Sequence, residues 1–438
     1  MEDDHTSPQL SKAAKSNTET PQQYHALTGL VVFLFFAWGF ATVLIDTLVP
    51  KLKGLFSLSY TEVMLTQFSF FIGYFLFSLP AAFILARIGY IRSAALGLGV
   101  MAAGCLLFAP ATALGLFPAF LLALFVMSAG IAMLQVTANP FIELLGSEET
   151  SHSRLTLAQA FNSLGTTVGP WVGAIMILSG GGALNTSGLS GPALSALRRS
   201  QAYVVQFPFL IIAAALTALA MVFWLMRKGS APHVVPEAAK LKTIAALLSR
   251  PRLALGTVAI FVYVGAEVTI GSLMANYLMQ SSVLGLEAFR AGQMVSLYWG
   301  GAMIGRFIGP FVLKRLRPGY VLAACAFGAA VLATVSCLAT GAGAAYSLIA
   351  VGIFNSIMFP TIFALATEPL GPETPSASGL LCMAIVGGAI LPVVTGAVAD
   401  RFGIATALLV PVLCYLWILA YGILAARGLG LVEHRSLP

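Results

Sequence analysis

The sequence predicts an all-α membrane protein of twelve transmembrane helices, arranged as two six-helix halves of similar structure. Three observations support this. Hydrophobic residues make up 59% of the 438 residues and charged residues only 9%, whereas soluble domains are about a quarter charged. Apolar stretches of the roughly 20 residues needed to cross a bilayer follow one another along the chain. Short motifs of the first half also recur in order in the second.

Each expected span is an apolar stretch, and polar, charged, Gly or Pro residues separate most neighbouring spans. The expected spans are 25–49, 60–86, 92–111, 117–140, 154–179, 201–226, 252–279, 290–311, 320–338, 344–367, 376–399 and 404–425.

The connections divide the chain into two halves and two tails. Residues 1–24 are polar and rich in Ser, Thr, Gln and Pro, so a disordered tail is expected. The long basic connection 227–251 separates six spans in 25–226 from six in 252–427, and 428–438 forms a second tail. The first apolar segment exceeds 20 residues and lacks a small-residue cleavage pattern, so no cleavable signal peptide is expected.

Most of the 23 Lys and Arg residues lie between spans on the side that also carries both chain ends. Because cytoplasmic loops are enriched in Lys and Arg, both termini are predicted to be cytoplasmic, in a bacterial inner (cytoplasmic) membrane. Since these charges are scattered among apolar stretches, no nucleic-acid partner is expected. The expected partners are the lipid bilayer and a small substrate, and the protein is expected to be monomeric.

The chain carries no motif of an enzyme or a metal centre. Its five Cys residues lie within apolar stretches and form no close metal-type pair, and none of its five His residues lies deep in a span. The sequence therefore predicts neither an enzyme nor a cofactor.

The internal repeat points to transport. Asn139-Pro140-Phe141-Ile142 in the fourth span matches Phe359-Pro360-Thr361-Ile362 in the tenth, and Trp38-Gly39-Phe40-Ala41 in the first can be aligned with Val264-Gly265-Ala266-Glu267 in the seventh. This alignment sets Asp46 opposite Ser272, and Ala41 opposite Glu267. Repeated halves with Gly- or Pro-interrupted helices are typical of secondary transporters, in which the halves rock around a site near the membrane midplane.

Three charged residues lie well inside the predicted spans, away from the span ends, where each costs at least about 2.5 kcal/mol to bury in lipid. Asp46 and Glu267 are predicted to carry a coupling ion or to bind substrate, since a desolvated carboxylate can take up a proton. For each, the alternative is a structural hydrogen bond to a neighbouring helix. Arg306 lies closer to the cytoplasmic face, where pairing with Glu143 or Glu368 predicts a structural or gating role.

Neutral polar and aromatic residues complete the predicted substrate site. An amide offers both a donor and an acceptor to a sugar hydroxyl, and an aromatic ring suits the apolar face of a sugar. Asn139 next to Pro140 is also well placed to join helices. The candidate substrate residues are Trp38, Asp46, Gln135, Asn139, Asn162, Glu267, Asn276, Tyr298 and Asn355. The residues predicted to be gating or structural are Arg306, Glu143, Pro140 and Pro360.

Several stretches resemble the fucose:proton symporter family of the major facilitator superfamily, in its glucose/galactose transporter branch. The resemblance covers the first eleven spans, and its longest motif runs from Arg154 to Gly165. The other motifs are Phe36-Ala37-Trp38-Gly39, Asp46-Thr47-Leu48-Val49-Pro50, Gln135-Val136-Thr137-Ala138-Asn139-Pro140-Phe141, Tyr263-Val264-Gly265-Ala266-Glu267, Gly305-Arg306-Phe307, Met358-Phe359-Pro360-Thr361-Ile362-Phe363 and Ile385-Val386-Gly387-Gly388-Ala389.

The resemblance implies symport of a sugar with a cation, and Asp46 matches the aspartate that the family uses for recognition and proton coupling. Two positions depart from the family pattern. Gln135 stands where fucose carriers have a coupling glutamate, which is similar to the glucose/galactose branch. Thr42, Val43 and Ile45 replace asparagines near Asp46, so the aspartate's surroundings are drier.

The predicted function is import of a neutral monosaccharide, a hexose such as glucose or galactose, by proton symport through alternating access. The alternatives are coupling to sodium, a carrier for fucose or N-acetylglucosamine, an exporter of non-sugar compounds, and a sugar sensor that does not transport. Sodium remains open because a carboxylate with amide and backbone oxygens also coordinates that ion.

Overall fold

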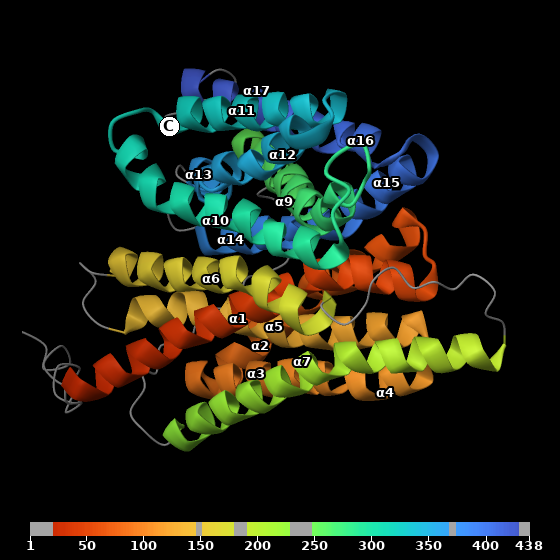
Figure 1. Cartoon of the computed structure of the whole chain (residues 1–438). Helices are drawn as coiled ribbons and strands as arrows, with labels where there is room; N and C mark the ends of the chain where they lie inside the picture. The colour runs from red at the N-terminus through yellow and green to blue at the C-terminus, as the bar shows by residue number, and fades with distance from the viewer. Residues whose placement is uncertain (1–20, 146–150, 179–190, 228–247, 368–373, 429–438) are drawn as a thin grey trace, which may run out of the picture.

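The computed structural model describes residues 21–145, 151–178, 191–227, 248–367 and 374–428, and in these ranges every regular element is helical. The helices form two bundles that face each other (Figure 1). The first bundle is made by the chain before residue 228 and the second by the chain after residue 247. Most of the predicted first tail and of the basic connection, and the last ten residues, lie outside the described residues.

The first bundle contains six membrane-length helical segments, two of which are interrupted. Its elements are α1 (Pro21–Phe56), α2 (Tyr60–Ile88), α3 (Tyr90–Leu106), α4 (Phe108–Leu114), α5 (Phe117–Leu144), α6 (Ser151–Gly173), the π-helical turn η2 (Ala174–Leu178) and α7 (Pro192–Met226).

The second bundle repeats this plan with more breaks. Its elements are α9 (Pro251–Leu278), α10 (Ala288–Leu313), α11 (Pro318–Leu338), α12 (Gly341–Asn355), α13 (Met358–Thr367), α14 (Thr374–Met383), the 3₁₀ turn η4 (Ala384–Val386), α15 (Gly387–Phe402), α16 (Ile404–Ala407) and α17 (Leu409–Arg427).

Eleven of these segments are long and apolar enough to span a membrane within the described ranges. The one predicted span not among these eleven, 290–311, corresponds to α10, which is 26 residues long but carries Arg290 and Arg306. Its polar side chains and many glycines fit a helix that faces protein rather than lipid on one side.

Some predicted boundaries were wrong. The first span was expected to end before Pro50, but α1 continues through Pro50 to Phe56. A proline is tolerated inside a membrane helix where neighbouring helices satisfy the freed backbone groups. The tenth predicted span, 344–367, is interrupted between α12 and α13, shortly before Pro360. The eleventh also breaks, at η4.

Helices α1 and α6 pack closely through glycines. Gly165, Gly169 and Gly173 recur every four residues on α6, so they form one face of that helix. A Cβ atom at Gly165 would overlap the carbonyl oxygen of Phe36, and one at Gly39 would overlap the carbonyl oxygen of Asn162. Such small-residue faces let membrane helices approach to backbone contact. This contact positions Asn162 beside the first helix.

We expect Gly165→Ala to destabilise the protein, because the added methyl group meets backbone atoms of α1 that cannot move independently. Overpacking of this kind costs about 1–3 kcal/mol of unfolding free energy. Gly29→Ala in α1 is the matched control, since a Cβ at Gly29 meets nothing within 4 Å. Thermal melting in detergent is the measurement. A melting temperature for Gly165→Ala equal to that of the control would contradict this account of the α1–α6 contact.

Candidate functional site

The carboxylate of Asp46 lies between the two bundles. Asp46 is only 7% exposed, on α1 of the first bundle. Its Oδ1 accepts a hydrogen bond from Ser272 Oγ of α9 at 2.9 Å and a longer one from Gln67 Nε2 of α2 at 3.3 Å. Asp46 therefore connects both bundles through one buried oxygen atom.

The pairing of Asp46 with Ser272 follows from the internal repeat. The sequence alignment of the two halves sets these residues at equivalent positions in the first and seventh spans. Where two repeats are related by a pseudo-twofold axis, equivalent residues near that axis contact each other. The 2.9 Å hydrogen bond is such a contact, and it places Asp46 close to the axis.

Gly271 allows the tryptophan of α10 to approach Asp46. A Cβ atom at Gly271 would lie 3.0 Å from Trp299 Cζ2 and 3.3 Å from Asp46 Oδ2. Glu267 lies four residues before Gly271, so the two share one face of α9. Asp46, Trp299 and Glu267 therefore border the same strip of α9, about one helical turn apart.

Glu267 belongs to a buried polar network in the second bundle. Tyr298 donates a hydrogen bond to the backbone carbonyl of Glu267 at 3.2 Å and accepts one from Asn355 Nδ2 at 2.8 Å. Tyr263 donates to the carbonyl of Asn355 at 2.9 Å. The side-chain Oε1 of Glu267 is buried and has no hydrogen-bond partner among the described residues. A buried acceptor without a donor is costly, so this atom is a candidate ligand contact.

Arg306 joins the bundles on the other side of this network. Its Nη1 donates to Ser163 Oγ of α6 at 2.6 Å, and Glu267 is near enough for electrostatic attraction. The expected partner Glu368 and the side chain of Glu143 lie outside the described part of the chain, so their pairing with Arg306 stays a prediction.

The amides of the first bundle hold α5, α6 and α1 together. Asn139 donates to the carbonyl of Gln135 at 3.2 Å, and its Oδ1 accepts from Gln159 Nε2 at 3.3 Å. Asn162 Nδ2 donates to the carbonyl of Phe35 at 3.0 Å. Asn139 thus has the helix-joining contacts considered above, and one side of the Asn162 amide is already used. Both remain substrate candidates through their other lone pairs and hydrogens.

The remaining substrate candidates differ in how many contacts they make. Asn276 on α9 is 6% exposed, and its Nδ2 has no partner within the described ranges. Trp38 packs against Phe35 with ring centroids 5.5 Å apart, and its carbonyl accepts a hydrogen bond from Thr42 at 2.9 Å. Asn276 therefore has free capacity for a ligand, whereas Trp38 is largely a packing residue in this conformation.

The bundles meet at the end of the molecule where α2 begins, here called the Tyr60 end. Asp400 of α15 accepts hydrogen bonds from the backbone N–H groups of Tyr60 and Thr61, at 2.6 and 2.8 Å, and from the Thr61 hydroxyl at 2.6 Å. Gln280 Nε2, two residues after the end of α9, donates to the Tyr60 hydroxyl at 3.3 Å. Asp400 thus satisfies two free N–H groups of the first turn of α2 from the opposite bundle.

The hydrogen bonds described between the bundles run from the Tyr60 end to Arg306. Between Asp400 and Arg306 lie the contacts of Asp46 and the 3.8 Å approach of Thr167 Oγ1 to Met303 Sδ. The contacts of Asp400 and Gln280 hold the two bundles together at the Tyr60 end, opposite the Pro251 end, where α9 begins.

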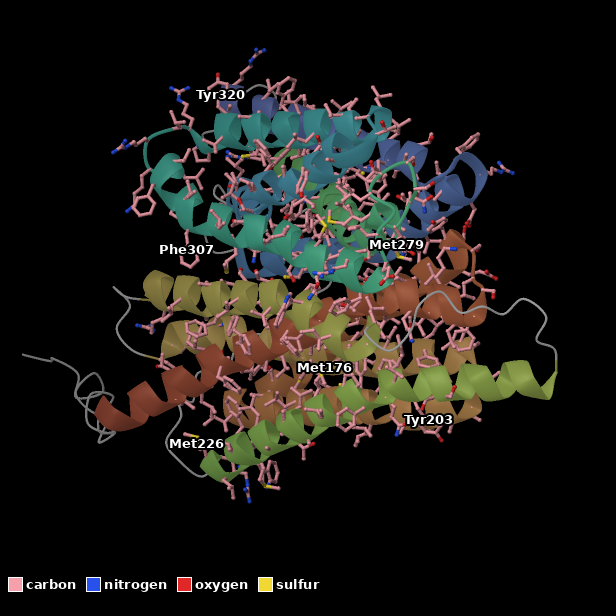
Figure 2. All side chains as sticks on the ribbon, in the orientation of Figure 1. Met176, Tyr203, Met226, Met279, Phe307 and Tyr320 are labelled. Atoms are coloured by element: carbon pink, nitrogen blue, oxygen red, sulfur yellow. The ribbon has the colours of Figure 1, made fainter. Side chains whose placement is uncertain are left out.

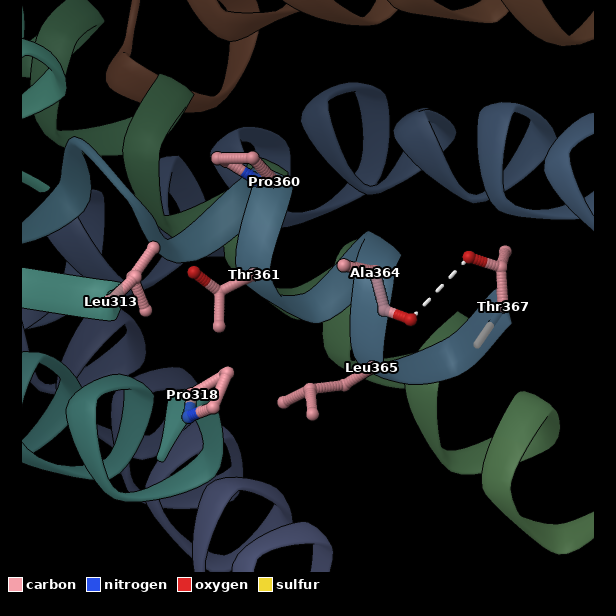
Figure 3. Close-up of a pocket in the computed structure, with 7 residues that line it drawn as sticks. All are labelled: Leu313, Pro318, Pro360, Thr361, Ala364, Leu365 and Thr367. Atoms are coloured by element: carbon pink, nitrogen blue, oxygen red, sulfur yellow. Dashed lines mark hydrogen bonds between the residues drawn. The ribbon is translucent and has the colours of Figure 1, made fainter. Parts of the chain in front are cut away.

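A cavity of about 440 Å³ lies in the second bundle, where residues at the end of α10, the start of α11 and along α13 meet (Figure 3), and Asp46 is not among its lining residues. It is lined by Leu313, Pro318, Pro360, Thr361, Ala364, Leu365 and Thr367. Pro360 is the only predicted site residue among them. Most of these side chains are apolar, so the cavity is a poor sugar site. Within the described residues no group of three or more His, Cys, Asp or Glu side chains is arranged to hold a metal ion.

Sequence reasoning missed one residue that contacts Asp46 and two that join the bundles at the Tyr60 end. Gln67 donates to Asp46, and Asp400 and Gln280 join the bundles at the Tyr60 end. Gln67 has a signal in the sequence, because it is an amide inside an otherwise apolar span. Asp400 and Gln280 lie at span ends, where polar residues are ordinary.

Comparison with known proteins gives one consistent result. Residues 29–391 match the family model described as Major Facilitator Superfamily. A glucose/galactose transporter of Brucella abortus biovar 1 is 46% identical, over 94% of this chain and 97% of its own. The L-fucose-proton symporter of Escherichia coli K12 is 33% identical, over 93% of this chain and 94% of its own.

A solved structure supports the fold. The crystal structure of a variant of the E. coli fucose:proton symporter superposes on this structure with a TM-score of 0.69 and 32% sequence identity. The match covers 92% of this chain and 99% of the symporter chain. The predicted fold class, twelve helices in two halves, is confirmed.

Proposed function

We propose that this protein imports glucose or galactose together with a proton. The chain belongs to the Major Facilitator Superfamily and, within it, to the fucose:proton symporter family. The chain is a multi-pass membrane transporter and not an enzyme. The relative with 46% identity is named a glucose/galactose transporter, and this supports a hexose rather than fucose or N-acetylglucosamine.

One observation carries the coupling mechanism: the buried Asp46 carboxylate is hydrogen-bonded across the two bundles. A proton that binds at this contact changes the hydrogen bonds that hold α1 to α9. Sugar that binds at the same interface acts on the same equilibrium between conformations. By linkage, the proton and the sugar then favour each other's binding, and the gradient of one drives the other.

We assign the sugar contacts to both bundles. Glu267 and Asn276 of α9 supply an acceptor and a donor that have no partner atoms in the described structure. Gln135 and Asn162 supply amides from the first bundle, and Trp38, Asn139, Tyr298 and Asn355 complete the proposed site. Arg306, Glu143, Pro140 and Pro360 are assigned to gating or to structure. Glu267 is also a candidate for the proton path, because it lies one turn from the contact of Asp46 with α9.

We assign the Pro251 end to the cytoplasm, with both termini, and the Tyr60 end to the outside of a bacterial inner membrane. The distribution of Lys and Arg supports this orientation. From the contacts between Asp400 and the start of α2, we infer that this conformation is closed to the outside, the state from which sugar is released inward. The proposed unit is a monomer with halves 25–226 and 252–427 joined by 227–251.

Uptake into proteoliposomes tests this function. We expect radiolabelled glucose or galactose to accumulate when the inside is made alkaline, and a protonophore to abolish accumulation. Replacement of sodium by choline at fixed pH is expected to leave uptake unchanged. Dependence on sodium would replace the proton by that ion, and competition by fucose but not by glucose would change the sugar. Hexose binding without counterflow would indicate a sensor, and no hexose binding at all would contradict the proposal.

A further inference from the structure

A second large groove lies on the first bundle, away from the interface between the two halves. It has a volume of about 790 Å³ and runs along α3 and α7. Its lining is mostly apolar or small, except for an arginine on each helix. The lining residues are Ile88, Arg92, Ala95, Leu96, Gly99, Val100, Ala103, Thr217, Ala220, Met221, Trp224 and Arg227.

Toward the Tyr60 end, α4, which directly follows α3, packs tightly against α7. There the rings of Phe108 and Phe209 stack with centroids 3.8 Å apart, and Thr112 Oγ1 donates to Gln206 Oε1 at 3.0 Å. Toward the Pro251 end small residues replace these contacts, and a Cβ at Gly99 would meet nothing within 4 Å. Met226 marks this end of α7 (Figure 2). A groove is therefore left along the exposed side of the α3–α7 pair.

The walls of the groove face the apolar part of the bilayer. Leu96, Met221 and Trp224 are 42%, 54% and 46% exposed, and all three lie in membrane-length helices. In such a position the exposed surface contacts hydrocarbon rather than water. The groove is apolar along most of its length, so a lipid acyl chain is the occupant that its chemistry favours.

Both arginines lie at the same end of the groove. Arg92 is in the first turn of α3 and Arg227 caps the end of α7, so each marks the Pro251 end of its helix. The guanidinium of Arg227 lies 4.2 Å from the centre of the Trp224 ring, and its Nη1 donates to the Trp224 carbonyl at 2.6 Å. This holds Arg227 at the edge of the groove. Basic groups between helices at the cytoplasmic side recognise anionic lipid headgroups.

We propose that this groove binds one anionic phospholipid, with its phosphate between Arg92 and Arg227 and an acyl chain along Gly99 and Ala220. The two arginines supply positive charge, which is balanced better by an anionic headgroup than by a zwitterionic one. The bound lipid fills the groove along α3 and α7 and so stabilises the first bundle. This inference concerns a surface distinct from the sugar site, and it stands whichever ion or sugar is transported.

The test measures lipid binding by the purified protein in detergent, by native mass spectrometry and by thermal melting. Phosphatidylglycerol is expected to bind and to raise the melting temperature more than phosphatidylcholine of the same chains. Each arginine contributes about fivefold in affinity near a charged surface, so Arg92→Gln with Arg227→Gln is expected to weaken binding about 25-fold. Arg317→Gln is the matched control, because Arg317 precedes α11 at the same end of the other bundle.

Two further arms separate headgroup from chain. Gly99→Leu keeps both arginines but fills the groove, and it is expected to reduce phosphatidylglycerol binding while melting without added lipid stays unchanged. Soluble glycerol phosphate at equal concentration is expected to give no stabilisation. The proposal is overturned if the double arginine variant or Gly99→Leu binds phosphatidylglycerol as wild type does. It is also overturned if phosphatidylcholine binds equally well or glycerol phosphate alone stabilises the protein.

Discussion

Asp46→Asn is expected to abolish hexose accumulation driven by a pH gradient while leaving hexose exchange across the membrane largely intact. An asparagine still offers an oxygen to Ser272 and Gln67, which donate to Asp46 Oδ1, but it does not bind and release a proton. An imposed gradient of one pH unit supplies about 1.36 kcal/mol per proton. Symport of one proton per sugar then supports up to about tenfold accumulation of the sugar. We expect this ratio to fall to about one in the variant.

The measurement compares two assays in the same proteoliposomes, uptake under an imposed pH gradient and counterflow without one. Asp46→Ala is expected to lose both, because the donors of Ser272 and Gln67 are then buried without an acceptor. Glu287→Gln, an exposed carboxylate at the start of α10, is the control and should match wild type. Full gradient-driven accumulation in both Asp46 variants would exclude this residue from coupling.

Glu267→Ala is expected to weaken hexose binding about 10- to 150-fold. The Oε1 atom of Glu267 is buried without a hydrogen-bond partner in the described structure, so a sugar hydroxyl is a fitting donor to it. A hydrogen bond to a charged group contributes about 1.5–3 kcal/mol, and 1.4 kcal/mol is a factor of ten in affinity. Equilibrium binding of radiolabelled glucose to purified protein is the measurement.

Two variants sharpen the test of Glu267. Glu267→Gln keeps an acceptor but cannot titrate, so weak but still gradient-driven uptake would assign Glu267 to sugar binding alone. Ser93→Ala is the control, because the Ser93 hydroxyl is also buried without a described partner but lies on α3, remote from the facing helices. Unchanged glucose affinity in Glu267→Ala would remove this residue from the sugar site.

The membrane fold was predictable from sequence because the bilayer imposes it locally. Each span must supply about 20 apolar residues and satisfy its own backbone hydrogen bonds, and both demands are visible in one linear stretch. The end of α1 was less predictable. Pro50 looked like a boundary, yet the helix continues to Phe56, because surrounding helices decide whether a proline in a membrane helix ends it.

Part of the candidate site was also readable. Asp46, Glu267 and Arg306 stand out because charge is rare and costly at lipid depth. The repeat further aligned Asp46 with Ser272, and the structure joins these two residues by a hydrogen bond. Arg306 shows the limit of this reasoning. Its hydrogen-bond partner is Ser163, an ordinary small polar residue on a helix of the other bundle.

The sequence by itself determined the number and order of the spans, the division into two halves and the carboxylates that are expensive to bury. Only the tertiary structure decided which partners these carboxylates have and which residues join the bundles at the Tyr60 end. Spans are encoded by hydrophobicity over neighbouring residues. The hydrogen bonds from Tyr60 and Thr61 to Asp400 join residues more than 300 positions apart, so they depend on how the two bundles meet. In transport by rocking halves, the two bundles take more than one relative position. One sequence must be compatible with all of these positions, so it does not show which contacts are made in a given one.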